Sequence, residues 1–112
     1  MKWAAACLTL SLAAMPIAAI GAERLDDCRS LVHHGKSSEA RRCFGGLLAS
    51  ADPFLRAEGY WGLERYEDAN NEFRTAQREH PKSAQIDVEW GRLFLARFNN
   101  EERMRRTVLH IG

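Results

Sequence analysis

The chain has 112 residues, with 16 Lys and Arg against 15 Asp and Glu, so its formal net charge is +1 at pH 7. A chain this close to neutral lacks the positive field that attracts nucleic acid or an anionic membrane surface, and we expect neither as a partner. Residues 23–112, which follow an apolar N-terminal segment, have the length of one small domain.

The N-terminal segment, residues 1–22, has the composition of a secretory signal peptide. A single basic residue, Lys2, precedes a run rich in Ala and Leu, and small residues close the run at Gly21 and Ala22. This pattern predicts cleavage after one of these two residues and export to the periplasm or the outside of the cell. The run is almost long enough to span a bilayer, so an uncleaved anchor is the alternative. Pro16 and the high Ala content favour cleavage.

Residues 23–52 predict a first helical hairpin. Apolar residues recur three and four positions apart, as on one face of a helix. They are Leu25, Cys28, Leu31 and Val32 in the first helix, and Ala40, Cys43, Phe44, Leu47 and Leu48 in the second. Between the two runs, Gly35 can take the left-handed conformation that closes a helix.

Cys28 and Cys43 are the only cysteines that remain after removal of residues 1–22. They fall on facing helices of the first predicted hairpin, in a chain bound for an oxidising compartment, so we expect a disulfide between them. The alternative is a small redox or thiol-dependent protein that uses this pair. The sequence has no Cys-x-x-Cys motif to support that alternative.

Residues 53–81 predict a second hairpin. Its second helix carries small and aromatic residues at helical spacing, and Pro81 ends it. These residues are Tyr66, Ala69, Phe73 and Ala76, and the shorter apolar face before them is Leu55, Tyr60, Trp61 and Leu63. The connection between the two runs is too short for anything but an antiparallel pair, which sets Ala57 against Ala69.

The two hairpins resemble each other in sequence, and residues 82–112 continue the pattern in part. A shift of 29 residues maps Leu25 on Phe54, Leu31 on Tyr60, Val32 on Trp61, Ala40 on Ala69 and Phe44 on Phe73. We expect a further helix up to Phe98, a turn at 98–100, and a last helix from Glu101. No polar helix follows to cover the open end, which a neighbouring copy or a longer array would have to cover.

This spacing is similar to that of the tetratricopeptide repeat, a helix–turn–helix unit of about 34 residues. With Pro81 on the final proline of the repeat, its signature positions carry Ala57, Tyr60, Tyr66, Ala69, Phe73 and Ala76. Pro53 and Arg56 stand where large apolar residues are usual. The resemblance implies an all-α fold, a short solenoid of stacked antiparallel hairpins with units at about 23–52, 53–81 and 82–112, preceded by a signal-peptide helix.

The resemblance also implies a function as a protein-interaction module. In that family the first helix of each repeat lines a concave groove that holds a peptide or a partner domain. The matching positions here are Arg29, His33, Glu58, Trp61, Glu89, Arg92 and Leu95. The alternatives are that Glu58, Glu89 and Arg92 are merely solvated, and that Trp61 only packs on the third unit.

No catalytic motif stands out in the sequence. Ser37, Ser38 and Ser50 lack a Gly-x-Ser-x-Gly setting, and the adjacent acidic pairs point to different sides of a helix. We therefore expect neither an enzyme nor a bound cofactor or metal. A purely structural role, without a groove, remains the third hypothesis.

Overall fold

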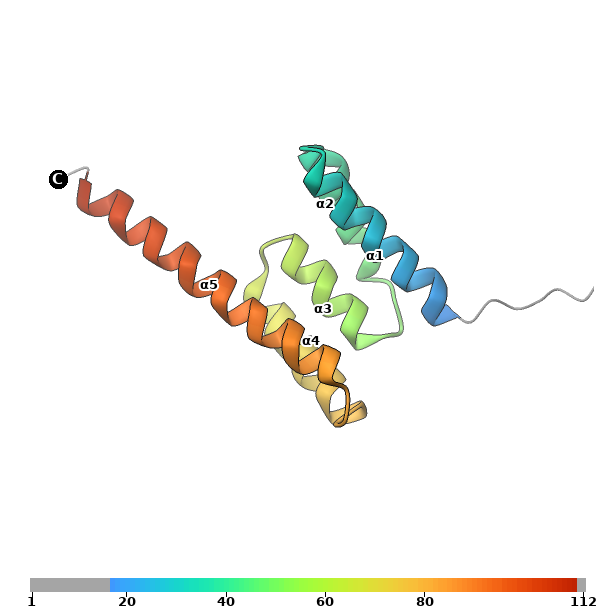
Figure 1. Ribbon diagram of the computed structural model, residues 1–112. Helices are drawn as coiled ribbons and strands as arrows, with labels where there is room; N and C mark the ends of the chain where they lie inside the picture. Colours follow the sequence, from blue (N-terminus) through green and yellow to red (C-terminus); the bar gives the residue numbers. More distant parts are fainter. Residues whose placement is uncertain (1–16, 111–112) are drawn as a thin grey trace, which may run out of the picture.

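The computed structural model describes residues 17–110, with side chains from Arg24 onward, and this part of the chain consists of helices without a β-strand (Figure 1). The expected all-α class is therefore confirmed. In chain order the helices are α1 (Ile17–His33), α2 (Ser37–Leu47), α3 (Pro53–Gly62), α4 (Tyr66–Glu79) and α5 (Ala84–His110).

Most of the predicted signal segment lies outside the described residues. Residues 1–16 are not described, and residues 17–22 form the beginning of α1. Over residues 17–110, no helix combines the length and the apolar character that a membrane crossing requires. Signal-peptide cleavage stays a prediction.

The turns that end α1 and α3 have the same backbone geometry. After α1, Gly35 has φ +70° and the Lys36 N–H donates to Leu31 O at 2.9 Å. After α3, Glu64 has φ 60° and the Arg65 N–H donates to Tyr60 O at 2.9 Å. Both are Schellman caps, in which a left-handed residue turns the chain out of the helix.

These two caps are 29 positions apart, the same shift that relates the two hairpins in sequence. The predicted left-handed cap at Gly35 is therefore present, and Glu64 holds the equivalent place in the second hairpin. A glycine adopts this conformation without steric cost, whereas a residue with a Cβ does so under strain. The self-similarity thus extends from side-chain pattern to backbone geometry.

The core divides into two clusters, one for each hairpin. The first gathers residues of α1, α2 and α3, namely Leu25, Cys28, Ala40, Phe44, Leu47 and Leu55. The second gathers residues of α3, α4 and α5, namely Ala57, Ala69, Phe73, Ala76, Ile86 and Leu93. The Ala57 and Ala69 side chains, expected to face each other, are both fully buried in this second cluster. Small side chains at this crossing let α3 and α4 approach closely.

Two glycines let α2 pack closely against α3. A Cβ atom added to Gly59 would lie 2.8 Å from Phe44 O and 3.0 Å from Leu47 Cβ. A Cβ atom on Gly62 would overlap the Phe44 ring. Because α2 and α3 belong to different hairpins, these contacts fix how one hairpin sits on the next.

The Cys28–Cys43 disulfide joins α1 to α2 within the first hairpin. The side chain of Cys28 is fully buried in the first cluster, and that of Cys43 is half-buried beside it. The expected pairing is present. It closes a loop across a sequence separation of 15 residues.

The predicted turn at 98–100 is wrong, because α5 continues unbroken from Ala84 to His110. Asn99 and Asn100 are weak helix formers but do not break a helix as Pro would. Ion pairs along the helix bridge this stretch, since Arg97 Nε lies 3.1 Å from Glu101 Oε1 one turn later. Such pairs stabilise a helix locally.

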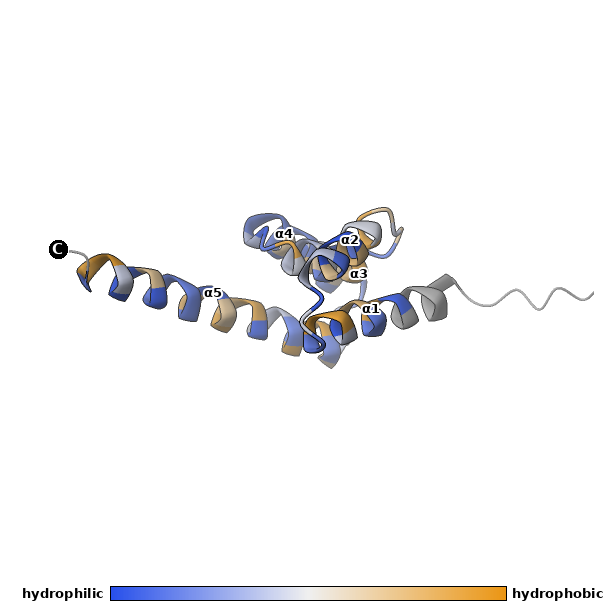
Figure 2. Cartoon of the chain, turned by 90° about the horizontal axis from the view of Figure 1, so that it is seen from above, coloured by the Kyte–Doolittle hydropathy of each residue, from blue (hydrophilic) through white to orange (hydrophobic). Residues whose placement is uncertain are grey.

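The helices are arranged so that α1 and α5 lie on one side of the molecule and α2 and α4 on the other, with α3 between them (Figure 2). α5 is held to α4 by Trp90 Nε1, which donates to Asn70 Oδ1 at 2.8 Å. Beyond this anchor, the C-terminal half of α5 projects away from the other helices (Figure 1). The arrangement leaves a hollow bordered by α1, α3 and α5.

Candidate functional site: a groove between α1, α3 and α5

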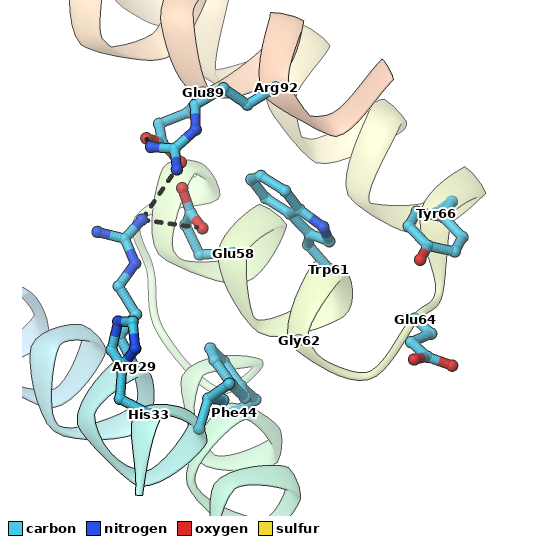
Figure 3. Close-up of a pocket in the computed structure, with 11 residues that line it drawn as sticks. Arg29, His33, Phe44, Glu58, Trp61, Gly62, Glu64, Tyr66, Glu89 and Arg92 are labelled. Atoms are coloured by element: carbon cyan, nitrogen blue, oxygen red, sulfur yellow. Dashed lines mark hydrogen bonds and ion pairs between the residues drawn. The ribbon is translucent and has the colours of Figure 1, made fainter. Parts of the chain in front are cut away.

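The hollow between these helices is an open groove of about 410 Å³, which we call the α1–α3–α5 groove (Figure 3). Charged residues and aromatic residues both contribute to its walls. The lining residues are Arg29, Val32, His33, Phe44, Glu58, Trp61, Gly62, Glu64, Tyr66, Glu89 and Arg92.

Six of the seven residues predicted to face a partner line this groove. They come in pairs from three separate segments: Arg29 and His33 from α1, Glu58 and Trp61 from α3, Glu89 and Arg92 from α5. The seventh, Leu95, does not line the groove, and 65% of its surface is exposed. α3 ends at Gly62, whereas α5 continues past this position to His110.

Four of these residues form a chain of ion pairs across the three helices. Arg29 Nη2 lies 3.4 Å from Glu58 Oε2 and 3.2 Å from Glu89 Oε2. Arg92 Nη1 lies 3.0 Å from Glu89 Oε1. We call Arg29, Glu58, Glu89 and Arg92 the ion-pair chain. It ties α1 to both α3 and α5 (Figure 3).

The two carboxylates of the ion-pair chain are buried, whereas its arginines reach solvent. Glu58 is 3% exposed and Glu89 is 8% exposed. The solvated alternative is therefore wrong for both, although it holds for the exposed side chain of Arg92. Buried carboxylates are rare unless they are paired, because water can no longer stabilise their charge.

Glu58 is incompletely paired. Its Oε1 atom is buried and has no hydrogen-bond partner in the described part of the chain. Burial raises the pKa of Glu58 to about 8, the Glu89 carboxylate contributes in the same direction, and Arg29 opposes the shift. The carboxyl group of Glu58 is thus mostly protonated at pH 7, and two acidic groups can share the site with one negative charge between them.

Aromatic side chains supply the apolar part of the groove. Trp61 lies beside Glu58 on the same face of α3, three positions later (Figure 3). It is half-buried and also packs against the second core cluster, so it contacts the core and the groove at once. The expected packing of Trp61 on the third unit is therefore compatible with a place in the groove.

Five lining residues were not expected at this site. They are Val32, Phe44, Gly62, Glu64 and Tyr66. Phe44 was expected only as an inward-facing residue of α2, and it reaches the groove because Gly62 leaves room for its ring. In the sequence, the only indication that the Phe44 ring approaches α3 closely was the glycine directly after Trp61.

Among the described residues, no three His, Cys, Asp or Glu side chains are placed to hold a metal ion. The disulfide lies in the first core cluster, outside the groove lining, with Cys28 inaccessible to solvent. Comparison of the chain with protein-family models, with curated proteins and with solved structures found no match. The site must therefore be interpreted from its own chemistry.

Proposed function

We propose that the chain is an exported protein-interaction module, built like a short tetratricopeptide-type solenoid, that holds a peptide or a partner domain in the α1–α3–α5 groove. The observation that carries the proposal is the convergence of six predicted contact residues from three sequence segments on one open groove. The repeated cap geometry at Gly35 and Glu64 supports the repeat architecture. The disulfide supports an oxidising compartment, where such bonds persist.

The character of the groove also favours binding over catalysis. Its arginine side chains pair with carboxylates but still reach solvent, and its aromatic rings offer contact area at low cost in conformational entropy. Aromatic and arginine residues are those that most often dominate binding energy in protein interfaces. The proposal therefore assigns Trp61 and Arg92 the largest contributions to the affinity for a partner.

The redox alternative stays a prediction from the sequence. No feature of the groove favours it. A cycling disulfide needs a sulfur atom that an attacking thiolate can reach. Burial of Cys28 supports a structural bond, with only Cys43 partly open to solvent. Thiol titration of the folded protein distinguishes the two roles, because a structural pair resists mild reductants.

A random-peptide display library tests the interaction module. The full chain should enrich peptides whose binding weakens at least tenfold, about 1.4 kcal/mol, in Trp61→Ala and in Arg92→Glu. Trp61 also contributes to the core, so Trp61→Ala could weaken binding simply by destabilising the fold. Arg92→Glu changes an exposed side chain and therefore tests the groove independently of the core. Arg103→Glu, which changes an exposed residue of α5 outside the groove lining, is the matched control.

Two results would contradict the proposal. A library that yields no binding peptide argues against an interaction module of this kind. Peptides that bind wild type, Arg92→Glu and Trp61→Ala equally well would show that the binding surface lies elsewhere on the molecule.

A further inference from the structure

We propose that the groove accepts a cationic side chain, a lysine or an arginine of the partner, whose N–H donates to Glu58 Oε1 while its aliphatic stem lies along Trp61. This inference rests on the proposed function and specifies the chemistry of the occupant. It depends on one buried oxygen, Glu58 Oε1, that has no hydrogen-bond partner among the described residues, on the ion pairs that its neighbours already form, and on the aromatic ring beside it.

Glu58 Oε1 is the one oxygen of the two buried carboxyl groups without a partner among the described residues. Glu58 Oε2 faces Arg29, and both oxygens of Glu89 face an arginine nitrogen, at 3.2 Å and 3.0 Å. Glu58 Oε1 has none, although Glu58 lines the groove and is 3% exposed. A buried acceptor left without a donor is unfavourable, and a ligand that supplies the donor removes that penalty.

The charges around the site favour a cation over an anion. The groove is lined by two arginines, Arg29 and Arg92, and both already face the carboxylates of the ion-pair chain. A third carboxylate, from an acidic ligand, would meet two buried acidic groups and would compete with them for the same arginines. A cation can instead take the place of the proton that Glu58 holds, so the total charge of the buried group stays the same.

The position of Trp61 suits a long cationic side chain. Trp61 lies beside Glu58 in the groove, so a side chain that reaches Glu58 passes along the indole ring (Figure 3). Lysine and arginine combine an apolar stem with a charged tip, and such stems pack well on apolar surfaces. A positive charge near an indole face is attracted by the ring as well.

Binding of a cation should expel the proton of Glu58. The titratable and charged groups that line the groove with Glu58 are Arg29 and His33 of α1, Glu89 and Arg92 of α5, and Glu64 in the turn after α3, and of these Arg29 and Glu89 act on its pKa. Burial and Glu89 hold the pKa of Glu58 near 8, and a bound ammonium or guanidinium group would lower it by stabilising the ionised form. At pH 7, complex formation should therefore release close to one proton for each cation bound.

The test uses peptides selected from the random library with the full wild-type chain. We expect lysine or arginine at one fixed position of the selected peptides. Replacing that lysine by norleucine, or an arginine by citrulline, keeps the length of the stem and removes the charge, and it should weaken binding at least tenfold. Glu58→Gln should weaken the cationic peptide by a similar factor and leave the norleucine peptide unchanged. Glu39→Gln, at an exposed carboxylate of α2, is the matched control.

Calorimetry in two buffers of different ionisation enthalpy gives a second readout. Proton release on binding of the cationic peptide should be present in wild type and absent in Glu58→Gln. A residue that only maintains the shape of the groove would not change the number of protons released.

The outcomes separate this inference from the proposed function. Selected peptides that are acidic or purely apolar, or a cationic peptide that binds Glu58→Gln as tightly as wild type, overturn the inference and leave the interaction module standing. A library without any binding peptide overturns both.

Discussion

Arg29 Nη2 lies 3.2 Å from Glu89 Oε2, although the two residues are 60 positions apart in the chain. The same nitrogen lies 3.4 Å from Glu58 Oε2, so one guanidinium group connects α1 with α3 and with α5. Arginine suits this place because its planar group offers several donors to more than one carboxylate. The contact brings α1, α3 and α5 together at one groove.

The stability of the protein should fall as the pH rises from about 4.5 to about 8. Burial raises the pKa of Glu58 from 4.5 to about 8, so in this range the folded chain holds a proton that the unfolded chain has lost. This favourable term is fully present below the unfolded pKa and is lost as the pH passes the folded pKa. Glu58→Gln, which cannot ionise, should lack it.

Urea unfolding at pH 5 and pH 9 measures this effect. The free energy of unfolding of wild type, relative to Glu58→Gln, should drop by a few kcal/mol between the two values. The difference between the two proteins removes the contributions of the other titrating groups. An equal pH dependence in both would show that Glu58 ionises normally in the folded chain.

Gly59→Ala and Gly91→Ala should change stability in opposite directions. Alanine is the better helix former by about 1 kcal/mol, and a Cβ atom at Gly91 meets no atom within 4 Å. At Gly59 the new Cβ atom would lie 2.8 Å from a backbone oxygen of α2, which cannot move without the whole helix. We expect Gly91→Ala to stabilise by up to about 1 kcal/mol and Gly59→Ala to destabilise by about 1–3 kcal/mol. Thermal unfolding compares them, and a stabilising Gly59→Ala would mean that α2 and α3 are not in close contact.

Glu64→Gly should stabilise the protein. Glu64 has φ 60° in the cap after α3, a conformation that costs a residue with a Cβ about 1–2 kcal/mol. Glycine avoids that cost but loses more backbone entropy on folding, so the net gain should be about 0.5–1 kcal/mol. Glu79→Gly, within a right-handed helical turn at the end of α4, should destabilise instead. A Glu64→Gly variant that loses stability would place the left-handed residue elsewhere in the turn.

Removal of the disulfide should lower stability without abolishing the helical fold. A loop of about 15 residues contributes about 3 kcal/mol in the chain-entropy model. The double variant Cys28→Ala with Cys43→Ala should therefore unfold at a lower urea concentration, and its circular dichroism spectrum should stay helical. If stability were unchanged while a thiol-dependent activity disappeared, the redox alternative would gain support.

Helical periodicity and turn chemistry predicted most of the fold. Most of the hairpin faces, the cap at Gly35, the disulfide and the burial of Ala57 and Ala69 follow from local patterns with spacings that helices impose, whereas Val32, expected on the apolar face of α1, is exposed. The cap at Glu64 could not be identified in the same way, because glutamate has no preference for a left-handed conformation. Only its position, 29 residues after Gly35, indicates it.

Long-range packing decided what the sequence could not predict. The turn expected at 98–100 is absent because Asn99 and Asn100 are tolerated inside a helix in which one ion pair spans them and another follows. The burial of Glu58 depends on how α1 and α5 close over α3, which local patterns do not encode. The resemblance to a tetratricopeptide repeat predicted Glu58 as a groove residue, but its unpartnered oxygen became visible only in the folded structure.

The most direct test of the account is a two-dimensional nitrogen–proton NMR map of the chain with the best peptide from the library. We expect the indole N–H signal of Trp61 to shift, together with backbone signals around Arg29 and Arg92. The indole N–H of Trp90 donates a hydrogen bond to Asn70, and neither residue lines the groove, so the signal of this N–H should not shift. Shifts that leave Trp61 unchanged and fall on α4 or on the projecting half of α5 would contradict the groove as the binding site.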